Sequence, residues 1–378
     1  MPYNKFFYYA RKIFHLFLLG LFLIINLFPK KYYKTIVICQ RGKLGDLICT
    51  TPLFRLVKKY YPDHKLVVIA REPFHQILEH NPYIDCLISF SAGQLMSSYI
   101  WVLRTGLMIR HRFHPDYFVN LFADFNASLL GVVTGAEKKA VTTTALDGKM
   151  QKIFYPFFNI RPYDYTSEAK THYLSFFDEI NPKSDDLSNE LFFTGNNQTV
   201  ELWSQKNNTR YPLIGVTVSS GKDFKHWPQK SWRELLKKLM LRYHAQVVFF
   251  GVSEELEEIK RVSDKLPGQN FIITDVSINE LPHYIKKCHL FIGVDTGPLY
   301  IADALKVPTV DIMGPCDEKT QKPDYGVIVT NQYYCHGQSK VLSQPKLSDY
   351  PAIKQCFESI TPQQVFSSCQ HILERGNN

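Results

Sequence analysis

The stretch Arg41–Pro52, RGKLGDLICTTP, decides how the first half of this chain is interpreted. It follows TIVIC (Thr35–Cys39), a β-branched run typical of a buried strand, and leads into LFRLVKKYY, whose apolar residues recur at helical spacing. Gly45 and Asp46 therefore stand at a turn from strand to helix. Such turns usually bind phosphate in α/β proteins, so the carboxylate at this turn needs an explanation of its own.

Composition predicts a globular protein with an anionic partner. Of 378 residues, 45% are hydrophobic and 21% are charged, and 44 Lys+Arg against 35 Asp+Glu leave a formal net charge of +9. This excess suits a phospholipid surface or a phosphorylated glycolipid, and the sequence has no RNA-binding signature or arginine-rich tract. The 8 cysteines form no CxxC pair, a usage typical of reduced, cytosolic chains. Cys316, Cys335 and Cys356 lack tight ligand spacing, so we expect structural or inert thiols, with metal binding as the alternative.

Residues 1–34 form a segment of a different kind. IFHLFLLGLFLIINLFP is almost wholly apolar and is flanked by Arg11-Lys12 and Lys30-Lys31. The run is shorter than the roughly 20 residues that a spanning helix needs, and no small-residue cleavage site follows it. We expect an N-terminal hydrophobic helix that associates with the membrane. A helix lying in the plane of the interface, a spanning helix and a buried core helix all stay open.

From Thr35 onward, strand and helix patterns alternate, which predicts parallel sheets. The polar stretch Asn181–Tyr211 separates two similar α/β halves. We predict a Rossmann-like lobe over residues 35–190, a linker over 191–210, a second Rossmann-like lobe over 211–345 and a helical tail over 346–378. Ligands of such folds bind at the carboxyl ends of the strands, here in a cleft between the lobes. In the tail, Thr361 is a candidate N-cap and Pro362 the first helical residue.

GVDTGPLYIADAL (Gly293–Leu305) is the strongest candidate phosphate site. A strand ends at Val294, Asp295-Thr296-Gly297 makes the turn, and a helix begins at once. The unpaired N–H groups of a helix start favour a diphosphate, Gly297 permits close approach, and Thr296 adds a hydroxyl. The alternative is that Asp295 or Thr296 only caps the helix.

SSGKDFKHWPQKSW (Ser219–Trp232) repeats this arrangement after another strand. Its hydroxyls and lysines can bind phosphate oxygens and offset their charge, and the candidates are Ser219, Ser220, Lys222 and Lys225. The alternative is a solvated basic loop with Trp227 as a packing residue.

Acidic residues supply the other candidates. Asp46 is either a general base or a helix cap. No DxD sequence is present, so we expect no metal and no metal–diphosphate clamp. Glu254 and Glu255, which follow FFG, are candidates for binding a ribose hydroxyl, although a solvated helix face explains them as well.

These motifs together resemble glycosyltransferase family 9, the ADP-heptose:lipopolysaccharide heptosyltransferases. The resemblance covers nearly everything after the hydrophobic leader. It rests on an ordered set of motifs: R-x-x-x-GD-x-x-x-TTP (Arg41–Pro52), Tyr61-Pro62, NPYID (Asn81–Asp85), K-HWP (Lys225–Pro228), FFG-x-x-E (Phe249–Glu254), DTGP-x-x-x-A-x-AL-x-x-P (Asp295–Pro308), MGP (Met313–Pro315) and C-x-x-x-I-x-x-x-x-V (Cys356–Val365).

The resemblance implies a GT-B fold, with the acceptor bound by the first lobe (35–190) and the nucleotide sugar by the second (211–345). It implies inverting, metal-independent transfer of heptose from ADP-heptose to the lipopolysaccharide inner core, at the cytoplasmic face of the inner membrane. It assigns Asp46 as general base, with Arg41, Lys43 and Gly45 on the acceptor side, and it directs Lys225 and the Asp295–Gly297 turn at the diphosphate. The family usually has His where this chain has Tyr300, which we also place at the donor. The alternatives are transfer from another nucleotide sugar to a cell-surface glycan, a non-catalytic member that binds a nucleotide or glycan, and a nucleotide-sugar epimerase.

Overall fold

The computed structural model describes Gly20, residues 33–331 and residues 350–375, except 92, 94–98, 123, 145–146, 149–150, 196, 199, 202, 204–210 and 221–224. The chain divides into two compact units. The first comprises Met1–Arg41, Val57–Glu72 and Tyr83–Tyr163. The second comprises Gly42–Leu56, Pro73–Pro82 and Asp164–Asn378, so it includes the stretch that carries Asp46.

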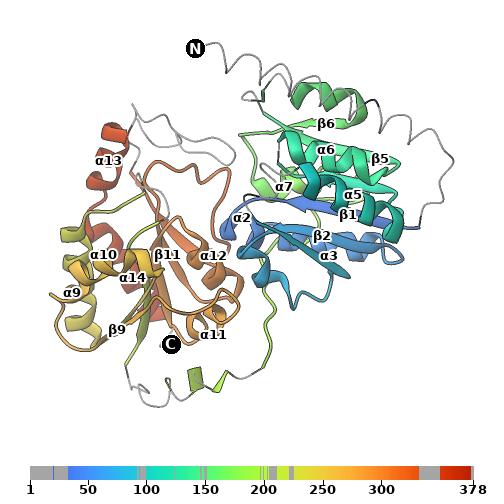
Figure 1. The fold of residues 1–378 in the computed structure, drawn as a ribbon. Helices are drawn as coiled ribbons and strands as arrows, with labels where there is room; N and C mark the ends of the chain where they lie inside the picture. Colours follow the sequence, from blue (N-terminus) through green and yellow to red (C-terminus); the bar gives the residue numbers. More distant parts are fainter. Residues whose placement is uncertain are drawn as a thin grey trace, which may run out of the picture. The chain divides into compact units, whose positions relative to one another are not determined.

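The first unit is built on a six-stranded sheet in the order β3-β2-β1-β4-β5-β6, in which every pair is parallel. Its strands are β1 (Thr35–Gln40), β2 (Lys65–Arg71), β3 (Cys86–Phe90), β4 (Tyr117–Asn120), β5 (Lys138–Thr143) and β6 (Asn159–Pro162). The helices α5 (Tyr99–Phe113) and α6 (Phe125–Thr134) lie side by side on one face (Figure 1), and their apolar residues share a core with the strands.

The second unit contains another parallel six-stranded sheet, in the order β12-β11-β10-β7-β8-β9. Its strands are β7 (Leu213–Thr217), β8 (Gln246–Phe250), β9 (Asn270–Ile273), β10 (Leu290–Val294), β11 (Thr309–Ile312) and β12 (Gly326–Val329). The helices α9 (Gln229–Tyr243), α10 (Leu256–Ser263) and α14 (Pro362–Arg375) cover one face, and α11 (Leu281–Ile285) and α12 (Gly297–Ala304) lie on the other (Figure 1).

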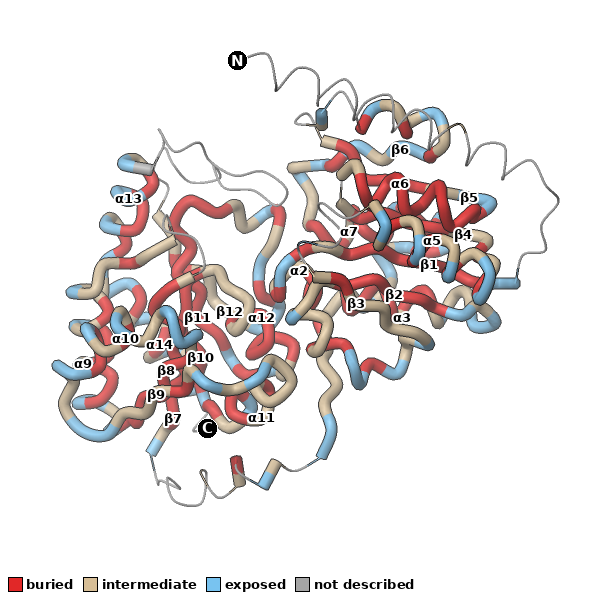
Figure 2. Tube along the Cα trace, viewed as in Figure 1, coloured by how far each residue is buried: buried red, intermediate tan, exposed pale blue. Residues whose placement is uncertain are grey.

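The remaining helices of the described chain are short or peripheral. They are α2 (Leu44–Ile48), α3 (Thr51–Tyr60), α7 (Ala169–Leu174) and α13 (Tyr350–Ser359), with 3₁₀ turns η1 (Phe74–Leu78), η2 (Gln151–Phe157) and η3 (Ser253–Glu255). Figure 2 shows that the buried residues of each unit concentrate on its strands and on the inner sides of its helices. Every residue of β1, β7, β8 and β10 is buried, as expected for parallel strands covered on both faces.

The two sheets have the same strand order. Read from β3 and from β9, each runs third-second-first-fourth-fifth-sixth along its half of the chain, the order of a doubly wound nucleotide-binding fold. The predicted α/β architecture with two Rossmann-like sheets is confirmed. In such sheets the ligand site lies where the strand order reverses, beyond the carboxyl ends of the strands. In the second unit this is the edge where β7 and β10 end.

The expected N-terminal hydrophobic helix lies outside the described residues, apart from Gly20, Tyr33 and Lys34. Among the residues that the structure describes, no helix is long and apolar enough to cross a membrane. The exact limits of the predicted lobes, linker and tail stay predictions.

The C-terminal tail ends in α14, which begins as its sequence predicts. The Thr361 hydroxyl accepts a hydrogen bond from the Gln364 N–H at 3.3 Å, and the Gln364 side chain accepts one from the Thr361 N–H at 2.8 Å. Val365 and Cys369 are buried in the core of the second unit. Cys356 takes part in a disulfide bond, so the expectation of an inert thiol is wrong at this position, whereas Cys316 is a free, buried cysteine.

Candidate functional site

The turn after β10 begins α12 as the sequence predicts. Thr296 is the N-cap residue, with extended backbone and no capping hydrogen bond from its side chain. Its hydroxyl lies 3.4 Å from the hydroxyl of Thr217, the last residue of β7. The reading of Thr296 as a side-chain cap is therefore wrong, because that hydroxyl faces the end of the neighbouring strand. The ends of β7 and β10 thus meet at the reversal point of the sheet.

Asp295 is the centre of a buried polar cluster at this turn. The Lys225 ammonium forms an ion pair with Asp295 Oδ2 and donates to the Asp295 carbonyl at 3.2 Å. The Tyr300 hydroxyl donates to Asp295 Oδ1 at 2.8 Å. The Cys316 thiol also hydrogen-bonds with Asp295 and Lys225. Lys225 was predicted to face a diphosphate; in this structure its ammonium group contacts Asp295, and its role toward a donor stays a prediction.

Mutual interaction keeps the Lys225–Asp295 pair ionised in spite of its burial. Burial lowers the pKa of Lys225, but the interactions with Asp295 and Cys316 together outweigh burial, so the pKa lies above its usual value. Burial raises the pKa of Asp295. The Lys225 charge and the hydrogen bonds to the carboxylate lower this pKa by more than burial raises it, so the pKa lies below its usual value. A buried pair of this kind depends on both partners, because removing one leaves the other charge unpaired.

The β7 side of the edge carries Ser219, which is buried, and Ser220, which is half-buried. Lys222 lies outside the described residues. Trp227 is a packing residue, as the alternative interpretation held. It is 1% exposed, its indole N–H donates to the Ile360 carbonyl at 2.9 Å, and its ring packs edge-on against Trp232.

Asp46 is the third residue of α2 and half-buried. Its Oδ2 accepts a hydrogen bond from the backbone N–H of Lys43, the N-cap residue, at 2.8 Å. A Cβ atom on Gly42 would come within 2.3 Å of the Asp46 Cβ, so only glycine leaves room for this arrangement. Asp46 therefore does cap the helix start, but from inside the first turn rather than as the N-cap. One carboxylate contact to a backbone N–H does not exclude a second role.

The helix α2 packs directly against α12 within the second unit. An ideal Cβ on Gly297 would lie 2.7 Å from the Leu44 Cβ, and one on Gly45 would lie 3.1 Å from the Tyr300 ring. Glycine at both positions lets the two helices approach this closely. The candidate base Asp46 and the turn Asp295–Gly297 are thus parts of one packed substructure, although about 250 residues separate them along the chain.

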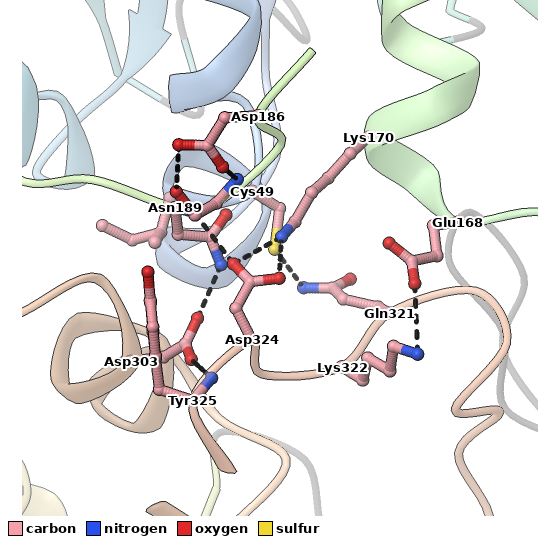
Figure 3. A network of polar contacts seen from close by, with 12 residues as sticks. Cys49, Glu168, Lys170, Asp186, Asn189, Asp303, Gln321, Lys322, Asp324 and Tyr325 are labelled. Atoms are coloured by element: carbon pink, nitrogen blue, oxygen red, sulfur yellow. Dashed lines mark hydrogen bonds and ion pairs between the residues drawn. The ribbon is translucent and has the colours of Figure 1, made fainter. Parts of the chain in front are cut away.

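A second polar network, shown in Figure 3, supports this packing from the side of α7. The ammonium of Lys170 on α7, 5% exposed, donates to both oxygens of Asp324 at 2.6 and 2.7 Å. The Asn189 backbone N–H also donates to Asp324, and its side chain donates to Asp303 of α12, both at 2.8 Å. The Gln321 amide donates to the Cys49 sulfur, at the end of α2, at 3.3 Å. Segments far apart in sequence are thereby fixed around α12.

The remaining predicted residues lie elsewhere. Glu254 is exposed, and Glu255 accepts from the Val252 N–H at 3.0 Å, as a cap of η3. Glu258 instead reaches the K-HWP motif, 3.0 Å from His226 Nδ1, and sequence reasoning missed this pair.

In the first unit, Arg41 pairs at 2.9 Å with Asp124, the N-cap of α6. Lys43 is exposed.

Asp311 on β11 is a buried acid that sequence reasoning also missed. It is fully buried, and neither carboxyl oxygen has a hydrogen-bond partner in the described part of the chain. Burial, together with the Asp295 charge, raises its pKa well above its usual value, and the Lys225 charge opposes this only in part. An uncompensated buried charge is costly, so the native state favours the protonated acid.

Asp311→Asn is therefore expected to remove a pH-dependent loss of stability. The folded protein keeps a proton that the unfolded chain releases near pH 3.8, so wild-type stability falls as pH rises above that value. We expect the stability of the variant relative to wild type to increase as the pH rises above the range in which the unfolded carboxyl titrates. Urea denaturation of both proteins measures this difference. Identical pH dependence would show that Asp311 is ionised in the folded state.

No cluster of three or more His, Cys, Asp or Glu side chains that could hold a metal ion occurs among the described residues. The candidate site therefore consists of an ammonium group, hydroxyls, a helix N-terminus and the Asp46 carboxylate. These groups can bind an anionic leaving group and accept a proton.

Comparison with known proteins agrees with this geometry. Residues 169–346 match the family model described as glycosyltransferase family 9 (heptosyltransferase). Lipopolysaccharide heptosyltransferase 3 of Escherichia coli strain K12 is 24% identical over 299 residues, which cover 74% of this chain and 82% of that protein.

Solved structures share the fold. A family 9 glycosyltransferase of Veillonella parvula superposes with a TM-score of 0.74 at 21% identity, covering 92% of this chain and 99% of that one. The E. coli ADP-heptose LPS heptosyltransferase II gives a TM-score of 0.70 at 18% identity, with coverage of 91% and 100%. The predicted family resemblance is confirmed, and with it the enzyme class: the chain is similar to glycosyltransferase family 9, whose model matches residues 169–346.

Proposed function

We propose that this protein transfers heptose from ADP-heptose to the inner core of lipopolysaccharide, with inversion at the anomeric carbon and without a metal ion. The similarity to lipopolysaccharide heptosyltransferases supports a heptose-transferring enzyme of lipopolysaccharide core synthesis. ADP-heptose is proposed as the donor because the similar E. coli structures include an ADP-heptose LPS heptosyltransferase and a heptosyltransferase with ADP-2-deoxy-2-fluoro heptose.

The packing of α2 on α12 is the observation that carries the proposal. It holds a half-buried carboxylate, Asp46, in the same compact unit as the turn Asp295–Gly297, which we propose binds the diphosphate. Glycosyl transfer to a hydroxyl needs these two elements together: a base for the acceptor and a site for the leaving diphosphate.

In the proposed reaction, Asp46 takes the proton of the acceptor hydroxyl while the oxygen attacks the anomeric carbon of the heptose. The new C–O bond forms as the bond to the β-phosphate breaks, and ADP leaves with the bonding electrons. Direct displacement from the face opposite the leaving group inverts the anomeric configuration. The backbone N–H bond from Lys43 to Asp46 Oδ2 helps to fix the orientation of the carboxylate.

In this proposal, groups at the edge where β7 and β10 end stabilise the leaving ADP. The first turn of α12 presents backbone N–H groups and the positive end of the helix dipole. The hydroxyls of Ser219, Ser220 and Thr296 add donors, and the ionised Lys225 adds charge close to the turn. Such preorganised donors stabilise developing negative charge without a metal ion.

Asp46→Asn tests the assigned base. Asparagine keeps the shape and can still accept the Lys43 N–H bond, so we expect normal folding and ADP binding. Turnover with ADP-heptose and a core acceptor should fall about 10²–10⁴-fold, since proton removal is lost. Steady-state kinetics measure the effect.

Glu280→Gln is the matched control for that variant. Glu280 also accepts a backbone N–H bond at a helix start, from Ser277 at 3.1 Å, but it lies outside the candidate site. It should retain wild-type turnover. Full activity of Asp46→Asn would reject Asp46 as the base.

We also propose that the protein works at the cytoplasmic membrane surface, with the first unit facing anionic lipid. A surface pocket at the amino ends of β1 and β2 is lined by Tyr33, Lys34, Thr35, Asp63, Lys65, Arg112 and Phe113. Three of these side chains are cationic, and only one of them, Lys34, has a carboxylate partner among these residues, Asp63 at 2.8 Å.

The position of this pocket along the chain favours a lipid partner. Tyr33 lies four residues after Pro29, where the apolar leader ends. At about 3.6 Å per extended residue, the pocket is within about 15 Å of the end of that apolar run. Basic side chains next to a membrane-associating segment attract anionic headgroups, each by about 1 kcal/mol.

Reversing two pocket charges should weaken this attraction. We expect the Lys65→Glu/Arg112→Glu variant to bind phosphatidylglycerol vesicles at least about tenfold more weakly than wild type in a sedimentation assay. Binding to neutral phosphatidylcholine vesicles should not change. Lys230→Glu, on the exposed side of α9, is the control. Equal binding of all three proteins would contradict a lipid-facing role of the pocket.

A further inference from the structure

Tyr300 occupies the boundary between the candidate base and the donor turn. It lies on α12 and is 1% exposed. Burial and the nearby charge of Asp295 raise the pKa of its phenol well above the usual value, so it is neutral at physiological pH. Its side chain therefore acts through one O–H donor and through the packing of its ring.

The hydroxyl group of Tyr300 is hydrogen-bonded to Asp295. It donates to Oδ1 at 2.8 Å, while the Lys225 ammonium contacts Oδ2. Both oxygens of the Asp295 carboxylate are thus bound by groups of the second unit. A phenol has a single proton to donate, so Tyr300 cannot give the same proton to a phosphate.

The ring has a separate contact. It packs against Gly45, where even a Cβ atom would lie only 3.1 Å from the Tyr300 Cδ2 atom. Gly45 directly precedes Asp46 in α2. The hydroxyl of this buried side chain therefore contacts the donor turn at Asp295, and its ring contacts α2, which carries the candidate base Asp46.

We propose that Tyr300 is a positioning residue: its hydroxyl holds the Asp295 carboxylate against Lys225, and its ring fixes the distance of α2, and so of Asp46, from the donor turn. In this role it binds no diphosphate oxygen itself. The second half of the proposal, the effect on Asp46, depends on the proposed function, whereas the first half does not.

The charged and titratable groups around Asp295 set the direction of the expected pH effect. They are Lys225 before α9, Tyr300 on α12, Cys316 after β11 and Asp311 on β11. Cys49, the C-cap residue of α2, also acts electrostatically on Tyr300. Only Lys225 is cationic. Removing the Tyr300 hydrogen bond leaves Lys225 as the main support of the Asp295 charge, so the Asp295 pKa must rise.

Two substitutions separate the two contacts. Tyr300→Phe keeps the ring and removes the hydroxyl, and Tyr300→Leu removes both. For Tyr300→Phe we expect the acid limb of ADP binding, followed by titration calorimetry of the full chain from about pH 3 upward, to move toward higher pH than in wild type, because the Asp295 carboxylate loses one of the hydrogen bonds that keep it ionised. For Tyr300→Leu we expect the same shift and, in addition, a fall in kcat of at least about tenfold relative to Tyr300→Phe, because Asp46 is displaced.

A thermal-unfolding cycle tests the Asp295 contact without any ligand. The combined loss in Tm of Tyr300→Phe/Asp295→Ala should be smaller than the sum of the two single losses, since each change removes the Tyr300–Asp295 hydrogen bond. Tyr284→Phe, which removes another largely buried tyrosine hydroxyl of this unit, should be additive with Asp295→Ala.

The outcomes are distinct. Weaker ADP binding by the same factor at every pH, with additive Tm losses, would identify Tyr300 as a direct diphosphate ligand and overturn the proposal. Unchanged binding, kinetics and Tm in Tyr300→Phe would overturn it as well. If wild type transfers no heptose, the proposed function fails, yet the Tm cycle and the ADP titration still decide whether Tyr300 holds Asp295.

Discussion

The close packing of α2 on α12 is the constraint on which the candidate site depends. Leu44 lies where a side chain on Gly297 would have to be, and the Tyr300 ring lies against Gly45. Because each contact needs a glycine opposite a large side chain, a single added methyl group would push the helices apart. The helix that carries the candidate base is thereby fixed to the helix whose first turn is the candidate anion site. Geometry held to within about an ångström is what proximity catalysis requires.

Buried charge is the second feature that shapes this unit. Lys225 with Asp295 and Lys170 with Asp324 are ion pairs with little solvent contact, and Asp303 and Asp311 are acids whose pKa values burial raises. Such groups contribute little net stability compared with apolar residues, but losing one partner is costly. Their value lies in specifying a single arrangement, since each bond joins segments that are distant along the chain. The turn after β10, the loop after β11 and α7 are connected in this way.

The sequence predicts the alternation of strands and helices because fully buried parallel strands are near-continuous apolar runs, as in β1 and β10. It also predicts which turns carry polar residues, since each of those turns begins directly after an apolar run that forms a strand. It does not identify β12, a four-residue edge strand with no periodicity of its own. Nor does it identify the partners of these polar residues. The Lys225–Asp295 pair and the α2–α12 contact depend on tertiary packing. Glu258 rather than Glu254 reaches His226 because η3 precedes α10 and sets which acids of that segment face the motif.

Titration calorimetry of the full-length protein with ADP, UDP, GDP and CMP, each in EDTA and in Mg²⁺, is the most direct test of the central claim. That claim is that the edge between β7 and β10 binds the diphosphate of an ADP-sugar through protein groups alone. The account predicts that ADP binds more tightly than the other three nucleotides and with the same affinity in EDTA and in Mg²⁺. A preference for UDP or GDP, binding that requires Mg²⁺, or no binding of ADP would contradict it.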